Sequence, residues 1–357
     1  MKLFRYLSPV TTLSLCTVAS LASITTATAQ IIPDSSLGAE SSVVNSNVVD
    51  GIDLINGGAT RGSNLFHSFQ EFNIGAGRGA YFSNPANIAN ILTRVTGGNP
   101  SNILGRLGVL GNANLFLLNP KGIFFGPNAS LDLRGGSFFG TTADSFIFNN
   151  NFEFSATNPQ AVPLLTVNVP IGLRFRDNPG NITNNANTFG LEVQPGNSLA
   201  LVGGNVSFKN GKLTAPGGRV ELGGVGGTGI VGLNVNSNNL FLSFPNNPAQ
   251  IQISAQELFL SYPDNITKAD ISAYQSSVEG NSIQLQGKQI TLTGGSSISA
   301  TDFSSYLNLL TENPITYVIS PKGGNVRINA EKLSVRDGSR VGASLTNRFS
   351  APGAKLT

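Results

Sequence analysis

The chain has 357 residues, of which 42 are glycine, 18 are proline and only 11% are charged, whereas an ordinary globular protein carries about 25% charged residues. Its 40% hydrophobic content excludes a disordered chain, which would combine low hydrophobicity with high net charge. The formal charge of only +3 gives no support to nucleic-acid binding, which requires a basic patch.

The first 29 residues are predicted to be a signal peptide. Lys2 and Arg5 form its positive end, an apolar stretch runs from Leu13 to Ile24, and Ala27-Thr28-Ala29 provides a small-residue cleavage site before Gln30. A membrane anchor is the alternative, but Ser and Thr interrupt the apolar stretch, and about 20 predominantly apolar residues are needed to span a bilayer. We therefore expect cleavage after residue 29 and export of the rest.

Removal of this segment would take away the only cysteine, Cys16. A lipoprotein would need a small residue just before that cysteine, but Leu15 stands there. Cleavage also removes two of the 22 basic residues, Lys2 and Arg5, and brings the net charge closer to zero. The mature protein is thus expected to contain no disulfides, and its stability must come from packing.

After residue 30, short alternating apolar stretches bounded by Gly, Asn and Pro recur along the chain, whereas helical periodicity is hard to find. Alternation with a period of 2 between turn residues is typical of strands. The sequence therefore predicts an all-β protein. The segment from about Ile31 to Asn56 is expected to form an N-terminal cap.

The region from about Val43 to Phe146 is dense in Asn, Gly and Phe. It contains three clusters, which in order are Asn64-Leu65-Phe66-His67-Ser68-Phe69-Gln70-Glu71-Phe72-Asn73, Val95-Thr96-Gly97-Gly98-Asn99-Pro100-Ser101 and Asn114-Leu115-Phe116-Leu117-Leu118-Asn119-Pro120-Lys121-Gly122-Ile123. These elements, in this order, resemble the two-partner secretion domain of filamentous haemagglutinins and related adhesins, also called the haemagglutination activity domain.

Two short motifs resemble motifs of this family residue by residue. Asn119-Pro120-Lys121-Gly122-Ile123 is similar to the family's NPNGI motif, with Lys121 in place of Asn. Asn84-Pro85-Ala86-Asn87-Ile88 is a weaker counterpart of its NPNL motif, with one inserted residue. The secretion-motif residues implied by the resemblance are therefore Asn119, Pro120, Lys121, Gly122, Ile123, Asn84, Pro85 and Asn87.

The resemblance implies a right-handed parallel β-helix, or β-solenoid, with N-terminal capping strands. It also implies that residues 30–150 form the two-partner secretion domain, which a cognate outer-membrane β-barrel transporter recognises through periplasmic POTRA domains. Residues 151–357 would be a β-helical repeat extension. The protein would pass through the periplasm and become a secreted or cell-surface adhesin, whose ligand would be a carbohydrate or protein of a host cell or surface.

The motif around Asn119 has the residues of a turn. Proline fixes φ, asparagine bonds to neighbouring backbone groups, and Gly122 accepts angles that other residues avoid. The residues leave two roles open: the turn contacts the transporter directly, or it only shapes a corner of the fold.

No catalytic, cofactor or metal site is predicted. Gly224, Gly226 and Gly229 spell GxGxxG, but a dinucleotide site needs a helix after that motif, and Ile230-Val231-Gly232-Leu233 is expected to continue as a strand. His67 is the only histidine, so a zinc cluster or a Ser-His site would lack partners.

A secreted β-helical protein that binds or degrades polysaccharides is the alternative function. Polysaccharide-cleaving enzymes use clustered carboxylates, whereas the acids here are scattered. Asp50 and Asp53 are close in sequence, but their odd separation places them on opposite faces of a strand. A structural matrix or surface-layer component is a third class, which the sequence does not separate from an adhesin.

A repeat becomes visible further along the chain. The series Ile283, Leu285, Ile290, Leu292, Gly295, Ile298 and Ala300 returns 43 residues later as Val326, Ile328, Leu333, Val335, Gly338, Val341 and Ala343. An earlier copy runs through Leu199, Leu201, Val206, Phe208, Gly211, Leu213 and Ala215. Another starts with Ile251, Ile253, Leu258 and Leu260 and reaches Ile271 and Ala273 through a longer loop.

Each copy contains three short strands in about 20 residues. Aliphatic residues at i and i+2 of a strand point to the same face, so three such strands around one axis make one coil, which must stack on its neighbours to be stable. The offset of 43 residues is interpreted as two coils of about 21 residues. The segment Ala351 to Thr357 resembles Ala215 to Glu221, where a new strand begins, so we expect the chain to stop inside a coil of a longer protein.

Overall fold

The computed structural model describes residues 30–149, 151–163, 167–237, 239–244, 257–261, 270–275, 282–293, 296–302, 325–337, 339–342 and 355–356. The predicted signal peptide lies outside these residues, as do five positions of the predicted repeats, namely Ile251, Ile253, Gly295, Gly338 and Ala343. Within the described part, the only helix is a three-residue 3-10 helix, η1 (Gly38–Glu40). No helix of that part is long and apolar enough to cross a bilayer.

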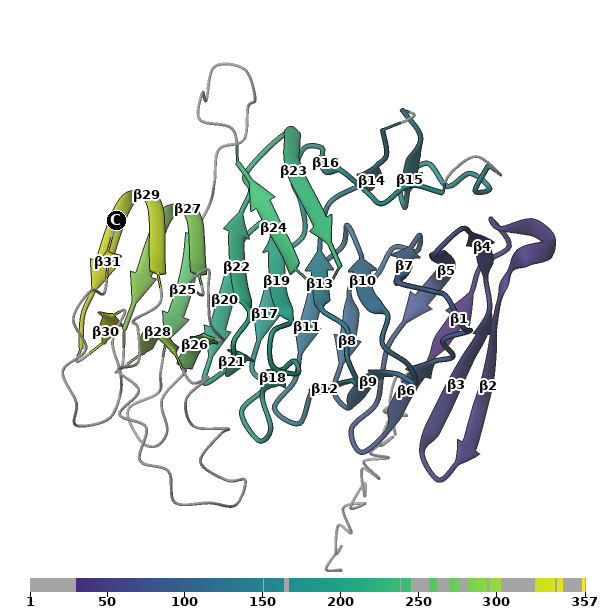
Figure 1. Cartoon of the computed structure of the whole chain (residues 1–357), viewed down its shortest axis with the longest axis horizontal. Helices are drawn as coiled ribbons and strands as arrows, with labels where there is room; N and C mark the ends of the chain where they lie inside the picture. The colour runs from purple at the N-terminus through teal and green to yellow at the C-terminus, as the bar shows by residue number, and fades with distance from the viewer. Residues whose placement is uncertain are drawn as a thin grey trace, which may run out of the picture.

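The fold is a right-handed parallel β-helix whose coils have their strands on three faces (Figure 1). The first face consists of parallel strands in chain order. They are β5 (Asn64–Phe72), β7 (Asn90–Val95), β10 (Asn114–Leu118), β13 (Phe138–Thr141), β19 (Ser198–Gly203), β22 (Arg219–Gly224), β27 (Ser282–Leu292), β29 (Asn325–Val335) and β31 (Lys355–Leu356).

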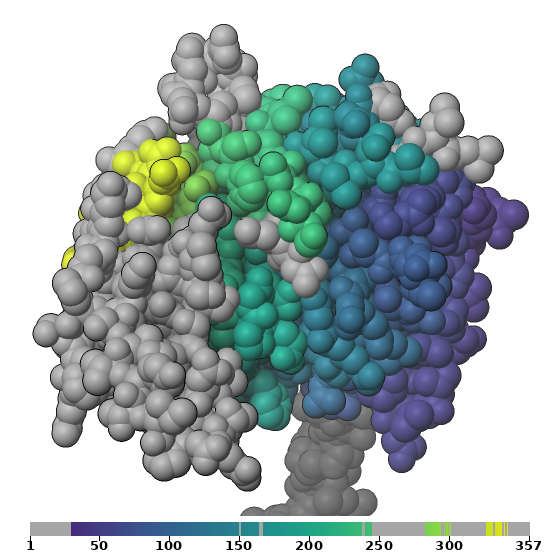
Figure 2. Space-filling model, in the orientation of Figure 1, coloured from purple at the N-terminus to yellow at the C-terminus, as the bar shows by residue number. Residues whose placement is uncertain are grey.

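The second face continues the same sheet, because β27 and β29 run through both faces. Its other strands are β8 (Ser101–Ile103), β11 (Ile123–Phe125), β17 (Ile182–Asn184), β20 (Val206–Lys209) and β25 (Glu257–Ser261). The third face consists of β3 (Ile52–Gly57), β6 (Gly79–Phe82), β9 (Arg106–Val109), β12 (Ser130–Leu133), β18 (Leu191–Glu192), β21 (Leu213–Ala215), β26 (Asp270–Gln275), β28 (Ser297–Asp302) and β30 (Arg340–Gly342). Figure 2 shows the colours following one another along the long axis, so sequence order is also spatial order.

The main core fills the interior of the coils. Inward positions stack from strand to strand, as in the ladder of Leu65, Ile91, Leu115, Phe138, Leu199, Val220, Ile283 and Val326. The predicted inward register is confirmed, because six aliphatic side chains of one copy are at most 1% exposed: Ile283, Leu285, Ile290, Leu292, Ile298 and Ala300. Gln284, between two of them, is half-buried and faces outward.

The interpretation of the 43-residue offset as two coils is wrong. Ile283 pairs directly with Val326, and Ile290 pairs directly with Leu333, so the two copies are adjacent coils. The three strands of one coil do occupy about 20 residues, as Ile283 to Ala300 show, but the rest of the offset belongs to the connection between the two coils. Because the length of this connection does not affect the pairing of the strands, the spacing of the repeats in the sequence does not by itself give the number of coils.

The N-terminal cap contains strands, as expected, and they pair antiparallel. Strand β1 (Ile31–Pro33) pairs antiparallel with β5, and β2 (Ser42–Val49) forms a hairpin with β3 at the end of the third face. Strand β4 (Ala59–Arg61) pairs antiparallel with β5. At the other end, Leu356 pairs with Val326, so a new strand of the first face begins where the sequence predicted one.

A second antiparallel sheet covers the outside of the first face, which the sequence did not predict. Its strands, in spatial order, are β15 (Glu153–Ser155), β14 (Ser145–Ile147), β16 (Gly172–Phe175), β23 (Gly229–Asn236) and β24 (Asn239–Ser243). We call it the covering sheet. It encloses a second core with outward side chains of the first face, including Phe66, Leu92, Phe116, Phe139 and Ala200.

Candidate functional site

The motif from Asn119 to Ile123 forms the turn between β10 and β11, at the corner where the first face meets the second. The side chain of Asn119 is fully buried. Its Nδ2 donates to the carbonyl oxygen of Asn99 (3.1 Å) and to Oγ of Ser101 (3.0 Å), and its Oδ1 accepts from the backbone nitrogen of Lys121 (2.9 Å). The side chain thus ties its own turn to the corner of the preceding coil.

Gly122 closes this turn with a φ of 128°. A Cβ at this position would lie 3.0 Å from the carbonyl oxygen of Asn181 in the next coil. The backbone nitrogen of Ser101 donates to the carbonyl oxygen of Gly122, and the backbone nitrogen of Gly180 donates to the carbonyl oxygen of Pro120. Both N···O distances are 3.0 Å. The turn is therefore packed between coil corners on both sides.

Only part of the motif reaches the surface. The side chain of Lys121 is exposed and Pro120 is half-buried, whereas Asn119, Gly122 and Ile123 are buried. Lys121 is also the position at which the motif departs from NPNGI. A direct contact between this motif and a transporter would therefore involve Lys121 and Pro120.

The second motif, Asn84-Pro85-Ala86-Asn87-Ile88, lies in the loop between β6 and β7, at the corner between the third face and the first. Pro85 and Asn87 are exposed, Asn87 has a φ of 70°, and Ile88 packs into the core. The side chain of Asn84 is half-buried and fills space beside Gly111, where a Cβ would lie 2.3 Å from Nδ2 of Asn84. The two motifs occupy different corners, so the structure does not bring them together.

An asparagine ladder marks the start of the first three strands of the first face. Asn64, Asn90 and Asn114 stack, with Nδ2 of each later residue donating to Oδ1 of the one before it over 3.0 Å. Oδ1 of Asn114 accepts from the backbone nitrogen of Ser137 (2.8 Å), and all three asparagines are at most 2% exposed. The repeated pattern of Asn before two apolar residues could have indicated this ladder in the sequence.

A buried arginine joins three parts of the N-terminal region. The guanidinium of Arg94 in β7 is fully buried and lies 4.3 Å from the centroid of the Phe154 ring. It donates hydrogen bonds to Oγ of Ser68 in the first face and to Oγ of Ser36 in the cap. It also donates to the carbonyl oxygens of Ser155 and Gln160, and the four donor–acceptor distances lie between 2.7 and 3.0 Å. Burial lowers its pKa to about 10, so the guanidinium stays charged at neutral pH.

The carboxylate of Asp34 in the cap completes this cluster. It accepts hydrogen bonds from the hydroxyls of Ser36, Ser68 and Thr96 over 2.6 to 2.7 Å. Burial raises the pKa of Asp34, but the hydrogen bonds outweigh it and hold the pKa below its ordinary value. We call Asp34, Ser36, Ser68, Arg94 and Thr96 the cap cluster.

Arg61 in β4 fixes the segment that follows β15 in a similar way. It forms a two-bond ion pair with Glu40 over 2.7 and 2.9 Å, and it donates to the carbonyl oxygens of Val162 (2.7 Å) and Pro163 (3.0 Å). The hydrogen bonds and the charge of this pair hold the pKa of Glu40 below its usual value. Arg61 and Arg94 thus hold residues 156–163 against the N-terminal cap.

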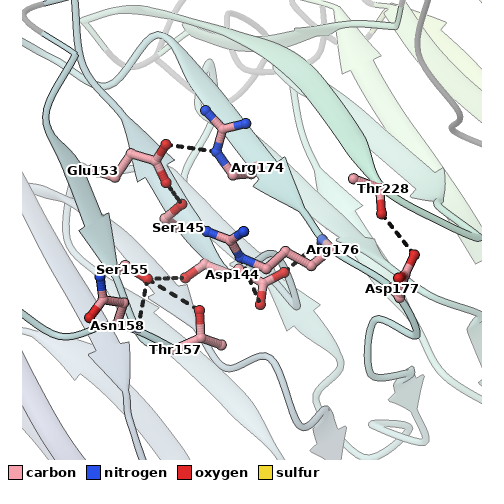
Figure 3. Close-up of polar contacts among 10 residues, drawn as sticks. All are labelled: Asp144, Ser145, Glu153, Ser155, Thr157, Asn158, Arg174, Arg176, Asp177 and Thr228. Atoms are coloured by element: carbon pink, nitrogen blue, oxygen red, sulfur yellow. Dashed lines mark hydrogen bonds and ion pairs between the residues drawn. The ribbon is translucent and has the colours of Figure 1, made fainter.

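A polar network fastens the covering sheet internally (Figure 3). Glu153 accepts from Oγ of Ser145 (2.6 Å) and from Nε of Arg174 (2.7 Å). Asp144 accepts from the backbone nitrogen of Arg176 (2.7 Å). Both carboxylates connect residues of β14, β15 and β16 or of the segments next to them, and they therefore have a structural role.

His67 lies inside the coils rather than on the surface. Its Nδ1 is 3.0 Å from Oγ of Ser42 in the cap, its ring stands against Phe69 and Phe82, and the side chain is fully buried. Burial lowers the pKa of His67 to about 3. The ring is therefore neutral at physiological pH and packs the cap onto the first coil.

The other sequence candidates take structural places. Gly229 begins β23, an antiparallel strand, so the GxGxxG pattern is followed by a strand as predicted. Asp53 pairs with Arg78 over 2.7 Å, whereas Asp50 is exposed. Across the described residues, no group of three His, Cys, Asp or Glu side chains could hold a metal ion.

A protein-family model described as the TPS secretion domain matches residues 29–269. Among solved structures, the HMW1 secretion domain from Haemophilus influenzae is similar over 88% of this chain and 74% of its own, with a TM-score of 0.54 and 19% identity, which shows a shared fold. The filamentous hemagglutinin secretion domain aligns over 91% of this chain and 96% of its own at 16% identity, with a TM-score of only 0.39. Comparison with curated proteins found no match.

Proposed function

Because the chain belongs to the family of TPS secretion domains and is therefore an exported two-partner secretion protein, we propose that residues 30–150 are the part that its outer-membrane transporter recognises. The signal peptide, residues 1–29, would deliver the chain to the periplasm, where POTRA domains of the transporter would bind it. Once outside, the protein would act as an adhesin for a carbohydrate or protein of a host cell or surface. The proposal includes no enzymatic activity.

The match of the family model over residues 29–269 supports recognition by a transporter, and the matched range includes residues 30–150. Within this range, the turn from Asn119 to Ile123 contains residues that suit two different roles. Asn119 is buried and its side chain bonds to the preceding coil corner, which supports the proposal that it shapes that corner. Lys121 is exposed on the same turn and is available to a partner.

Two substitutions separate these roles. We expect Asn119→Ala to weaken folding, because it removes three hydrogen bonds at a buried position, each worth about 1 kcal/mol. We expect Lys121→Ala to leave the fold intact and to reduce binding to the transporter. The exposed Lys209 at the end of β20 provides a matched control, Lys209→Ala.

Each variant would be co-expressed with the cognate transporter, and the protein released into the medium would be measured. Circular dichroism of the purified chains would report β-sheet content, and titration with the isolated POTRA domains would report binding. Reduced release and binding of Lys121→Ala, with wild-type β content and normal release of Lys209→Ala, would support contact through this turn. Undiminished release of both Asn119→Ala and Lys121→Ala would contradict any role of the motif in export.

A further inference from the structure

The outer surface of the first face changes character between β19 and β22. One ladder of outward positions starts apolar and lies beneath the covering sheet, with Phe66, Leu92, Phe116, Phe139 and Ala200. In the following coils the same ladder continues with Glu221, Gln284 and Arg327. The parallel outward ladder changes in the same way, from Val202 to Gly223, Gln286 and Asn329.

A cavity of about 450 Å³ lies where this change occurs, beside the last strand of the covering sheet. Its lining residues come from β22, β24, β27 and β29 and the residue after β24, and they are Arg219, Phe241, Leu242, Ser243, Phe244, Gln284, Gln286, Arg327 and Asn329. In Figure 2 the green atoms of the covering sheet stand beside the yellow atoms of β29 on the upper face. Binding sites for small molecules typically enclose about 300 to 1,000 Å³, so the cavity has the size of such a site.

Gly223 helps to shape this cavity. A Cβ at Gly223 would lie 2.6 Å from the Phe244 ring and 3.2 Å from a methyl group of Val202. The absence of a side chain therefore lets Phe244 approach the first face and form one wall. The exposed part of the Phe241 ring, 36% of that residue, adds a second apolar surface.

The charges around the cavity favour an anion. Arg219 forms an ion pair with Glu221, a fully buried carboxylate. Burial raises the pKa of Glu221 to about 7, so this carboxyl only partly offsets the two guanidiniums near neutral pH. Arg327 is exposed, and its charge also acts on Glu221, which stands two coils before it in the same ladder.

The remaining polar groups suit hydroxyl groups rather than a second charge. The amides of Gln284, Gln286 and Asn329 and the hydroxyl of Ser243 can each donate and accept hydrogen bonds. Together with the Phe241 ring, they offer the combination of apolar surface and a few polar groups that orients a small ligand. We propose that this cavity binds a carboxylate-bearing saccharide unit, with Arg327 holding the carboxylate and the amides holding the hydroxyls.

The cavity lies on β22 to β29, whereas the turn from Asn119 to Ile123 lies between β10 and β11. The test uses the mature chain, residues 30–357, titrated calorimetrically with trigalacturonate, with the neutral trisaccharide maltotriose and with acetate. Trigalacturonate should bind, whereas maltotriose and acetate at equal concentration should bind at least tenfold more weakly. Equal binding of maltotriose would overturn the requirement for a carboxylate, and equal binding of acetate would overturn the requirement for a saccharide.

Two variants locate the site. Arg327→Gln should weaken trigalacturonate binding about 10- to 100-fold, the range for a lost charge-assisted hydrogen bond of about 1.5 to 3 kcal/mol. Arg336→Gln makes the same change of charge at another exposed arginine in the same coil, outside the cavity, and should bind like the wild type. Circular dichroism would confirm that both variants keep the β-helix. Unchanged binding by Arg327→Gln, equal loss in both variants or no binding by the wild type would overturn the proposal.

Discussion

The first coils and the last coils of the β-helix share the same interior but differ on the outside. In both regions, aliphatic side chains stack along the axis with the same register. The first coils add an antiparallel cap, an asparagine ladder, the cap cluster and a second core beneath the covering sheet. The described part of the last coils presents polar side chains at the corresponding outward positions, such as Gln286 and Asn329. The interior thus defines the coil, whereas the exterior distinguishes the regions.

This difference is expected to appear as unequal stability. The N-terminal region combines two cores with buried polar clusters whose hydrogen bonds depend on one another. Breaking such a cluster by removing one charged member leaves its partners buried and unsatisfied, which costs more than the loss of a surface contact. Substitutions at matched positions of the two regions therefore test whether their stabilities differ.

The largest effect is expected for Arg94→Ala. This change removes four hydrogen bonds that join the cap, the first face and the segment after β15. We expect the free energy of unfolding to fall by about 3 to 5 kcal/mol, measured by urea unfolding of residues 30–357. Arg336→Ala, at an exposed arginine of a late coil, should change it by less than about 0.5 kcal/mol. Equal effects of the two substitutions would contradict the stabilising role of the cap cluster.

A second pair of substitutions tests the covering sheet directly. Leu118 and Gln286 face outward in different coils, and only Leu118 is buried in the second core. We expect Leu118→Ala to cost about 2 to 5 kcal/mol and Gln286→Ala less than about 0.5 kcal/mol. Their inward neighbours, Leu117 and Leu285, are both buried in the main core, so Leu117→Ala and Leu285→Ala should have similar costs in the same unfolding assay. A large cost at Gln286 would show that the late coils are covered as well.

The two regions should also respond to pH in opposite directions. The pKa of His67 falls from 6.5 to about 3 on folding, so the unfolded chain binds more protons below pH 6.5. Its contribution to stability is therefore full above pH 6.5 and declines as the pH falls toward 3. Between pH 6.5 and 5, the loss should be about 2 kcal/mol.

Glu221 behaves in the opposite sense. Its pKa rises from 4.5 to about 7 on folding, so the folded chain binds more protons between these values. Its contribution is full below pH 4.5 and declines as the pH rises through 7, by a total on the order of 3 kcal/mol. Urea unfolding curves of the wild type, His67→Gln and Glu221→Gln at pH 5 and pH 7 would measure the contribution of each side chain to the pH dependence of stability. Differences from the wild type that do not change with pH would contradict both assignments.

The sequence predicted the interior of the fold better than its exterior. Period-2 aliphatic pairs, such as Ile283 and Leu285, can face only one axis, and the structure places them there. The covering sheet could not be found this way, because strands β14 to β16 and β23 to β24 interrupt the coils and follow no common period. Phe116 and Phe139 face outward into the second core. The unbroken apolar run from Leu115 to Leu118 indicates a strand buried on both faces, but it does not indicate which segment covers the outer face.

The candidate site was predicted in part for a similar reason. The composition of Asn119 to Gly122 predicted a turn, and a turn is present. Asn119 is buried because the corner of the preceding coil, which contains Asn99 and Ser101, packs against it. This contact results from the stacking of the coils, so the motif alone could not indicate it. The cap cluster joins Asp34, Ser68 and Arg94, which are too far apart in sequence for spacing to relate them.

The corner between the first and second faces provides the smallest and most local comparison. In the early coils it is a distinct turn, where Gly122 has a φ of 128° and approaches Asn181. In the late coils β27 and β29 run through this corner without a turn, and Gly287 of β27 pairs with Ala330 of β29. Since alanine already occupies the equivalent position one coil later, we expect Gly287→Ala to change the free energy of unfolding by less than about 0.5 kcal/mol. Gly122→Ala should cost about 1 to 3 kcal/mol, because a side chain strains a left-handed backbone and here also meets a carbonyl oxygen. Urea unfolding of both variants would measure the difference, and a tolerated alanine at Gly122 would mean that the turn relaxes without the neighbouring coil opposing it.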